Sequence, residues 1–316
     1  MKNKLKIIYN DLRAVAAIKA NTGNMPRGHN CTVTIETTSV CNLACPLCPT
    51  GTKTLIRDKK FIDIAHFKKM VDITYPYATS YVLNIWGEPT FHPQFFELLD
   101  MIPNKTIWLS THLNYSNKVA EELAKRPNLL LICSIDTLNP EEYPKYRING
   151  NYQQVMDNFA ILAKGECKPY PQFLIEPNGV EEKKAILSFA AKHHIPDSQL
   201  TIKEKRDNFR LDESDEAIKG VCHSPYMDIY FNCDGYLIPC CNNIRKELYI
   251  DHIDNLNGIE DITHGTKFSR VRTQLAKDKN VYACCHLCRG ETWRNTIAPK
   301  YQNYINKINS LSKKKA

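Results

Sequence analysis

The sequence predicts an α/β fold: a partly closed (β/α)6, TIM-like barrel of six parallel strands, followed by a small cysteine-rich α+β domain with a hairpin and a helix. Three observations predict this fold. Short apolar and β-branched segments alternate with helix-length segments over residues 31–205, which is typical of a parallel sheet covered by helices. A charged, weakly apolar stretch begins near residue 206. Seven of the 13 cysteines follow it, which indicates a second module.

Residues 1–30 precede the barrel as a helical lead. The opening segment "MKNKLKIIYNDLRAVAAIKA" has the basic start of a signal peptide, but Asn10, Asp11 and Arg13 interrupt the apolar run that such a peptide requires. We therefore expect an amphipathic helix here.

Strands and helices alternate regularly from residue 31 onward. The segment "CTVTIET" alternates β-branched and polar residues, as a strand does. The later strands are short apolar runs, and the segments between them are read as helices. The predicted strands are 31–37, 81–85, 106–110, 129–135, 172–175 and 199–203, and the predicted helices are 63–75, one starting near Pro93, 116–126, 152–163 and 181–193. In such a barrel, functional loops gather at the carboxyl ends of the strands.

The cysteine-rich region has its own turn signal. "MDIYFNCDGYLIPC" reads as a hairpin that turns at Asp234–Gly235. We expect four parts: the lead at 1–30, the barrel at 31–205, the cysteine-rich domain at 206–300, and a basic tail at 301–316.

Composition excludes several classes of protein. No run of 18 apolar residues predicts a membrane span, and no interior stripe of aromatic and basic residues favours nucleic acid. The net charge of +8 comes partly from lysines at the two ends of the chain. Without an export signal, 13 cysteines favour metal ligation over disulfides. We therefore expect a cytoplasmic enzyme.

Three cysteines, Cys41, Cys45 and Cys48, follow the first strand in "SVCNLACPLCPTG". A four-iron, four-sulfide cluster takes four thiolates, so this C-x3-C-x2-C triplet leaves one iron open for a ligand. The alternative is a zinc site completed by His29 or His66, although zinc motifs usually pair C-x2-C units.

This loop resembles the signature of radical S-adenosylmethionine (radical SAM) enzymes, whose open iron chelates the methionine part of the cosubstrate. Further stretches are similar to that family. "NIWGEP" resembles its Gly-Gly-Glu-Pro motif, which implies that Gly87 and Pro89 shape the backbone and that Glu88 accepts from the cosubstrate ammonium.

Two more stretches extend this resemblance. "CSIDTLNPEEYPKYR" is similar to the family's fourth-strand segment, which implies that Ser134 and Asp136 lie near the ribose and Arg147 near the carboxylate. "LSTHLN" resembles the segment after the third strand and implies ribose contacts for Thr111 and Asn114.

The late cysteines resemble the SPASM or shorter twitch extension of radical SAM enzymes. The resemblance implies one auxiliary [4Fe–4S] cluster, because no cysteine follows the last C-x2-C pair. Its ligands would be Cys222, Cys240, Cys285 and Cys288. The neighbouring Cys241 and Cys284 leave the register open, and a four-cysteine zinc site is the alternative.

Polar residues at the strand ends should line the substrate cavity. These are Glu36, Asn84, His112, Glu176 and Lys203, of which His112 and Glu176 are candidate catalytic residues together with Cys233. The resemblance implies reductive cleavage of S-adenosylmethionine to a 5′-deoxyadenosyl radical, with a flavodoxin- or ferredoxin-type reductant. We expect that radical to abstract hydrogen from a small polar, sugar- or aminocyclitol-like substrate, which is oxidised with the auxiliary cluster as electron acceptor.

Three alternatives remain open. The first is epimerisation with Cys233 as hydrogen donor, and the second is maturation of a peptide or protein. The third is a zinc-stabilised interaction protein without enzymatic activity.

Overall fold

The structure is a computed structural model, and it describes residues 2–26, 31–55, 57–177, 179–205, 222–242, 246–286 and 288. Its described residues group into two compact units. The larger unit, here the barrel unit, comprises the described parts of 30–209 and 228–259. The smaller, here the helical unit, comprises those of 1–29, 210–227 and 260–316. His29 and the tail at 301–316 lie outside the described residues.

One mixed sheet organises the barrel unit. Its strands run in the order β6-β5-β4-β3-β2-β1-β7-β8-β9, and β1 to β6 are all parallel, which confirms the predicted α/β class. The strands alternate with helices along the chain, as crossovers between parallel strands usually do. The six parallel strands are β1 (Cys31–Ile35), β2 (Ala78–Val82), β3 (Thr106–Thr111), β4 (Leu129–Asp136), β5 (Lys168–Ile175) and β6 (Thr201–Glu204).

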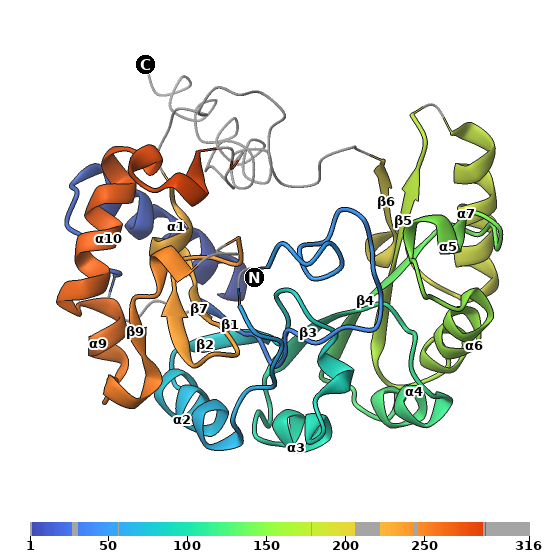
Figure 1. Cartoon of the computed structure of the whole chain (residues 1–316), viewed down its shortest axis with the longest axis horizontal. Helices are drawn as coiled ribbons and strands as arrows, with labels where there is room; N and C mark the ends of the chain where they lie inside the picture. The colour runs from blue at the N-terminus through green and yellow to red at the C-terminus, as the bar shows by residue number, and fades with distance from the viewer. Residues whose placement is uncertain are drawn as a thin grey trace. The chain divides into compact units, whose positions relative to one another are not determined.

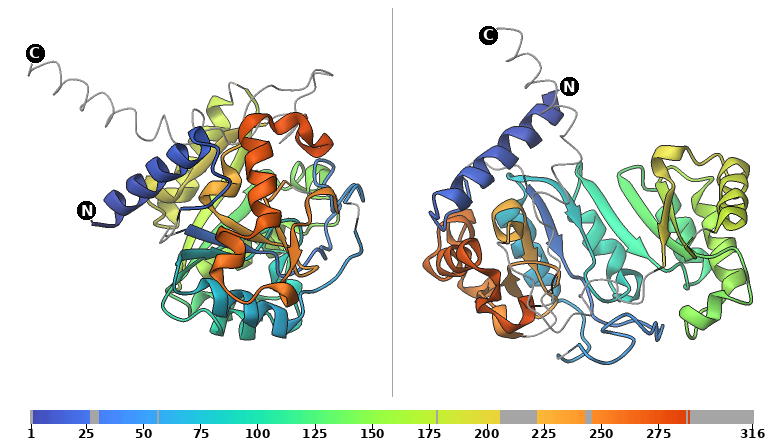
Figure 2. Two further views of the ribbon diagram at one scale, coloured as in Figure 1. Left: turned by 90° about the vertical axis from the view of Figure 1, so that its left-hand side faces the viewer. Right: turned by 90° about the horizontal axis from the view of Figure 1, so that it is seen from above.

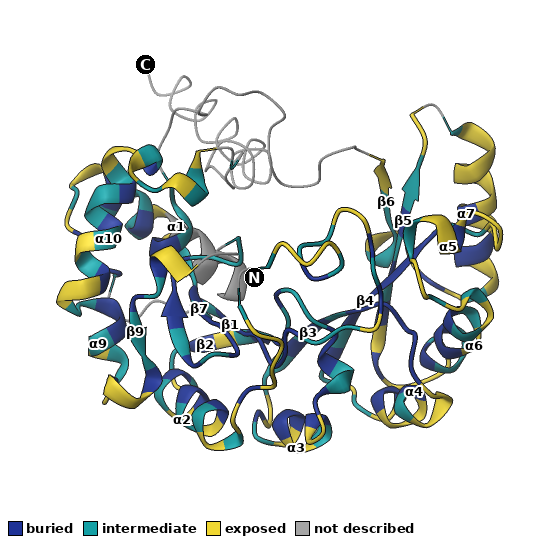
Figure 3. Cartoon of the chain, in the orientation of Figure 1, coloured by how far each residue is buried: buried dark blue, intermediate teal, exposed yellow. Residues whose placement is uncertain are grey.

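Helices cover the outer side of this sheet, while the loop after β1 lies on its inner side (Figures 1 and 2). The longer helices bury apolar residues, and the central strands β1 and β4 are mostly buried, whereas the edge strand β6 is partly exposed (Figure 3). Asp63 starts the first of the helices by accepting hydrogen bonds from the N–H groups of Ala65 and His66. The helices are α2 (Ile64–Thr74), α3 (Phe95–Asp100), α4 (Asn117–Ala124), α5 (Tyr143–Tyr146), α6 (Tyr152–Leu162) and α7 (Val180–Lys192).

Two strands start three or more residues away from their predicted positions. β2 lies at Ala78–Val82, three residues earlier than the apolar run "YVLNI" suggested, because the polar segment before that run makes the ladder. β5 starts at Lys168, not at residue 172. Pro169 and Pro171 lack the N–H that a ladder uses, but here they pair only with β4, because β6 joins at Gln172.

The hairpin forms as predicted, but it continues the barrel sheet. β7 (Ile229–Phe231) and β8 (Tyr236–Ile238) are antiparallel, and Gly235 turns between them with φ +91°. β7 pairs in parallel with β1, and the short β9 (Asp251–His252) pairs with β8. A free edge at β1 is thereby covered.

The helical unit contains α1 (Lys2–Lys19), α8 (Ser224–Met227), α9 (Ile259–Thr263) and α10 (Thr266–Lys277), so the expected amphipathic lead is helical. Ala14 and Ile18 of α1 pack against Tyr226. The fully buried Arg272 donates to the carbonyl oxygens of Pro225, Ile262 and Thr263 at 2.8 to 3.1 Å. Across the described residues, no helix is long and apolar enough to cross a membrane.

Candidate active site

The cysteine triplet occupies a compact loop directly after β1. Cys45 is buried, whereas Cys41 and Cys48 are partly exposed. The N–H of Cys48 donates to the carbonyl of Cys45 at 3.1 Å, which folds the C-x2-C pair into a tight turn. A Cβ on Gly51 would lie 2.4 Å from the carbonyl oxygen of Cys45. Only glycine therefore fits where the loop closes on itself.

The described residues do not bring His66 to this triplet as a fourth ligand. The close group of metal-donor side chains among them consists of His66, His252 and Asp254 and does not include these cysteines. His66, one proposed fourth zinc ligand, belongs to that other group.

The polar contacts of the sulfurs fit a cluster. The N–H of Leu43 points at Cys41 Sγ, 3.4 Å away, and Arg147 Nη1 lies 3.7 Å from Cys45 Sγ. Such donors stabilise negative sulfur ligands. Burial raises the pKa of Cys41 to about 12, so metal binding must displace a proton from this thiol. The loop therefore has the donor set and hydrogen bonds that an iron–sulfur cluster uses.

The Gly-Glu-Pro segment packs directly against this loop. Glu88 N–H donates to the carbonyl of Val40 at 2.9 Å, and a Cβ on Gly87 would lie 2.2 Å from the carbonyl oxygen of Thr38. Pro89 begins the 3-10 turn η1 (Pro89–Phe91). These contacts explain why the backbone needs a glycine and a proline on either side of the glutamate.

Three donors orient the buried Glu88 carboxylate. They are Thr111 Oγ1 at 2.8 Å, Thr90 Oγ1 at 2.9 Å and the N–H of His112 at 3.0 Å. Of these, Thr111 is a residue for which the sequence implied a ribose contact. In the structure its hydroxyl positions Glu88.

His112 and Asn114 support the same region. The N–H of Asn114 donates to His112 Nδ1 at 2.9 Å, so Nε2 carries the ring proton, and Nε2 lies 3.3 Å from the Glu88 carboxylate. Burial lowers the pKa of His112, although Glu88 opposes this effect. The Asn114 amide donates to the Tyr143 hydroxyl at 2.8 Å and accepts from Asn151 N–H at 2.6 Å. Asn114 thus ties the segment after β3 to α5 and to the start of α6.

Asp136 and Arg147 form the second polar pair. Arg147 Nε donates to Asp136 Oδ2, while Asp136 Oδ1 is buried without a hydrogen-bond partner. The backbone of Asp136 has an uncommon conformation, with φ +67°, and the β4–β5 register shifts between Ser134 and Asp136. Ser134 is buried beside it.

A cavity of about 330 Å³ opens beside this pair. The cysteine loop contributes Pro46 and Leu47, and the ends of β4 and β6 contribute Asp136 and Glu204. Lys205, Glu142 and Lys145 add charge to its wall. Asp136 therefore lines a hollow that the cysteine loop borders.

The other predicted strand-end residues lie apart from this cavity wall. Glu176 is 63% exposed and pairs with Lys205 at 2.7 Å. Of these two residues, only Lys205 lines the cavity. Lys203 donates to Gln172 at 2.8 Å, and Asn84 Oδ1 accepts from Ser110 N–H at 2.9 Å.

A buried ionic network that the sequence did not reveal surrounds Glu36 and Cys233. The Glu36 carboxylate accepts from the Arg57 guanidinium, from Trp86 N–H at 3.2 Å and from Cys233 N–H at 3.1 Å. Arg57 Nη1 lies 3.6 Å from Cys233 Sγ and 3.5 Å from Asp234. Burial, with Glu36 opposing ionisation, raises the pKa of Cys233, so this residue stays a thiol.

The late cysteines fall in both units. Cys222, Cys285 and Cys288 lie in the helical unit, and Cys240 follows β8 in the barrel unit. The neighbouring charges of Cys285 and Cys288 add to the burial that raises the pKa of Cys222 to about 12. The buried Lys279 donates to the carbonyls of Cys285 and Cys288 at 2.8 and 2.9 Å, which fixes the C-x2-C turn.

Comparison with known proteins matches this arrangement. The family model described as "Radical SAM superfamily" matches residues 35–175. The family model described as "Iron-sulfur cluster-binding domain" (SPASM) matches residues 222–289. A curated relative, GTP 3′,8-cyclase from Mannheimia succiniciproducens, is 24% identical over 127 residues, which cover 39% of this chain. The match spans only 38% of that relative.

Solved structures share the fold. Streptococcus suis SuiB bound to S-adenosylmethionine is 12% identical with a TM-score of 0.59, covering 78% of this chain and 68% of SuiB. Native anSMEcpe with bound AdoMet is 13% identical with a TM-score of 0.60, covering 78% of this chain and 82% of that protein.

The chain belongs to the radical SAM superfamily and carries a C-terminal SPASM domain. Its cofactors are therefore S-adenosylmethionine, a [4Fe–4S] cluster and auxiliary iron–sulfur chemistry in the SPASM region. The matched segments contain both the Cys41–Cys48 loop and the late cysteines.

Proposed function

We propose that this protein cleaves S-adenosylmethionine reductively at the Cys41, Cys45 and Cys48 loop and oxidises a small polar, sugar- or aminocyclitol-like substrate. When bound, the cluster supplies the electron that releases a 5′-deoxyadenosyl radical from the cosubstrate. In the proposed oxidation the substrate would lose a hydrogen atom to that radical and a proton to a base, and the auxiliary iron–sulfur site would supply the acceptor for the remaining electron. Cys222, Cys240, Cys285 and Cys288 are proposed to hold one such auxiliary cluster.

The observation that carries the proposal is the pairing of two preset carboxylates with the cysteine loop. Glu88 is held by three donors and suits the cosubstrate ammonium. Asp136 offers a buried oxygen without a partner, which suits a ribose hydroxyl. Arg147, fixed by Asp136, supplies a positive charge next to Cys45 that suits a carboxylate.

The size and charge of the cavity favour a small substrate. A volume of about 330 Å³ is near the lower end of the range for small-molecule sites. Its wall includes both acidic and basic side chains, Glu204 and Lys205 among them, which suit hydroxyl and amine groups.

The proton acceptor is best sought outside His112. Its Nδ1 already accepts an N–H, and its Nε2 carries a proton, so it has no free lone pair. Of the candidate bases that the sequence offered, Glu176 remains, through its ion pair with the cavity residue Lys205.

Two variants test cosubstrate binding. In the reconstituted enzyme, Glu88→Gln and Asp136→Asn should each weaken binding of labelled S-adenosylmethionine about tenfold or more, a loss of about 1.4 kcal/mol or more. Iron content should stay the same. Glu181→Gln, an exposed glutamate paired with Lys184, is the matched control. Unchanged binding in both test variants would contradict the proposal.

A screen of polar metabolites tests the reaction under anaerobic, reducing conditions. A true substrate should raise 5′-deoxyadenosine above the abortive background and give a product two electrons more oxidised. In deuterated buffer, a product at the substrate's oxidation level with one solvent deuterium would instead establish epimerisation. Cys233 lines a separate cavity from the one beside the cysteine loop, which weighs against it as hydrogen donor there.

A peptide substrate is the second candidate. SuiB bound to its precursor peptide SuiA and anSMEcpe bound to the Cp18Cys peptide share this fold with TM-scores of 0.58 and 0.57. Stimulation of 5′-deoxyadenosine formation by a peptide panel, with none by the metabolites, would favour this candidate.

A further inference from the structure

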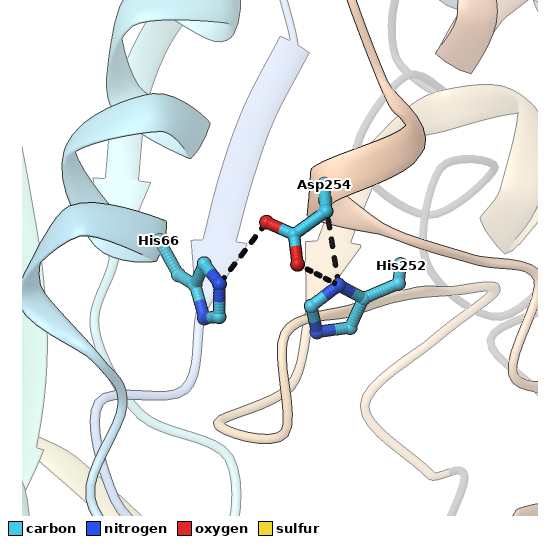
Figure 4. A group of neighbouring side chains, drawn as sticks. All are labelled: His66, His252 and Asp254. Carbon is cyan, nitrogen blue, oxygen red and sulfur yellow. Dashed lines mark hydrogen bonds and ion pairs between the residues drawn. The ribbon is translucent and has the colours of Figure 1, made fainter.

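Two histidines and an aspartate meet on the barrel unit, in a group to which neither motif assigns a role. His66 lies in the first turn of α2, His252 ends β9, and Asp254 lies in the 3-10 turn η4 (Ile253–Asn255). Figure 4 shows both imidazoles facing the carboxylate. His66 Nε2 is 3.1 Å from Asp254 Oδ1, and His252 Nδ1 is 3.0 Å from Asp254 Oδ2.

Hydrogen bonds indicate the tautomer of His252. Its Nε2 lies 3.2 Å from the carbonyl oxygen of Asp234, an atom that can only accept, so Nε2 carries a proton. Its Nδ1 caps η4 by accepting from the N–H of Asp254 over a long 3.4 Å contact, which an ion bound at Nδ1 would replace. Nδ1 also lies 3.0 Å from a carboxylate oxygen of Asp254, and a cation between these two acceptors, either a proton or a metal ion, removes their repulsion.

We propose that His66, His252 and Asp254 bind a divalent transition-metal ion, with Zn²⁺ the best match. Two imidazoles and a carboxylate are a donor set that transition metals prefer. A metal-bound histidine almost always donates its other ring N–H to a carbonyl or carboxylate, as His252 does to Asp234.

The spacing of the three donors suits such an ion. Bonds of about 2.0–2.1 Å in a tetrahedron place ligand atoms roughly 3.3 Å apart, and the two imidazole nitrogens lie 3.1 and 3.0 Å from the two different oxygens of the Asp254 carboxylate. All three donor atoms lie within 4.8 Å of one another.

The backbone holds both imidazoles in place before any ion binds. Asp63 caps α2 by accepting from the N–H of His66 at 3.1 Å, which fixes the turn that carries this residue. A Cβ on Gly235 would lie 2.4 Å from His252 Nε2, so glycine at the hairpin turn makes room for the ring. The only cation that touches Asp254 in the described contacts, Lys69, donates to its carbonyl oxygen at 3.1 Å.

An ion here would tie α2 to the hairpin that carries Cys233 and Asp234. The two histidines line a cavity of about 440 Å³ together with Cys233 and Asp234. Three protein ligands leave one tetrahedral position for water or a small ligand. A bound metal ion would therefore restrain the hairpin that carries Cys233 and Asp234, the two residues that join the network around Glu36.

Zinc binding to the full-length protein with its iron–sulfur clusters assembled tests the proposal. The protein is dialysed anaerobically against Zn²⁺ and passed through a desalting column, and zinc and iron are counted by mass spectrometry. We expect about one zinc per chain beyond the iron. His66→Asn and His252→Asn should each weaken zinc binding at least about tenfold, with iron content unchanged. The matched control is His264→Asn, because His264 faces a single carboxylate, Glu260, at 3.0 Å.

X-ray absorption of the bound zinc gives an independent readout on the unmutated protein. Nitrogen and oxygen ligands at about 2.0–2.1 Å support the site, whereas sulfur at about 2.3 Å would place the zinc on cysteines and overturn it. The proposal also fails if the unmutated protein retains no zinc, since a proton then bridges the groups. It fails equally if both histidine variants retain as much zinc as the control.

Discussion

Replacing Arg57 by methionine should destabilise the barrel unit strongly. The Arg57 side chain is 4% exposed and that of its partner Glu36 is 0% exposed, so the substitution leaves a buried carboxylate without its countercharge. Breaking such a pair costs about 3–5 kcal/mol. Glu36 keeps hydrogen bonds from the N–H groups of Trp86 and Cys233, which places the expected loss near the lower figure.

Thermal unfolding of the reconstituted protein measures this loss. At roughly 2–4 °C per kcal/mol for a unit of this size, a loss of about 3 kcal/mol lowers Tm by roughly 6–12 °C. The double variant Arg57→Met/Glu36→Gln removes both charges and should lower Tm by less than Arg57→Met alone, because replacing a whole buried pair is far cheaper than breaking it.

The exposed pair Lys184–Glu181 provides the matched control. Its side chains are 67% and 85% exposed, so Lys184→Met should cost at most about 1 kcal/mol. If Arg57→Met lowered Tm no more than Lys184→Met, or if the double variant lost the full sum of its two single losses, the assignment of a coupled buried pair would be refuted.

Three further predictions concern local geometry. Gly87→Ala should lower the iron bound by the protein at least severalfold, because the new Cβ would lie 2.2 Å from the carbonyl oxygen of Thr38. The control is Gly258→Ala, whose new Cβ would meet no atom within 4 Å and should leave the bound iron unchanged in the same assay. Lys279→Met should release the two carbonyls that it holds and selectively lower the auxiliary iron, seen by electron paramagnetic resonance; retention of both cluster signals would count against it. Asp63→Ala should cost about 1 kcal/mol, or roughly 2–4 °C in Tm, and Asp63→Asn much less, since asparagine also caps helices; equal losses would argue against capping.

The alternation of strands and helices could be predicted from the sequence because most elements bury one face, which gives their apolar residues a periodicity that is visible over a few positions. The strands that contradicted expectation are instructive. The first half of β5 was not predicted because it contains Pro169 and Pro171. Proline is compatible with a strand only where its missing N–H is not needed, and that depends on which strands pair with this segment. The hairpin was visible in Asp234–Gly235, but its parallel pairing with β1 was not, because it joins residues about 200 positions apart.

The sequence by itself determined the cysteine triplet, the Gly-Glu-Pro segment and the late cysteines, because each encodes its chemistry in spacing over a few residues. Only the tertiary structure decided that Thr111 and His112 orient Glu88, that Arg57 joins Glu36 and Cys233, and that His66 meets His252 and Asp254. These groups come from elements that a parallel sheet brings together at one edge or that pack across separate strands, and no local periodicity carries that information.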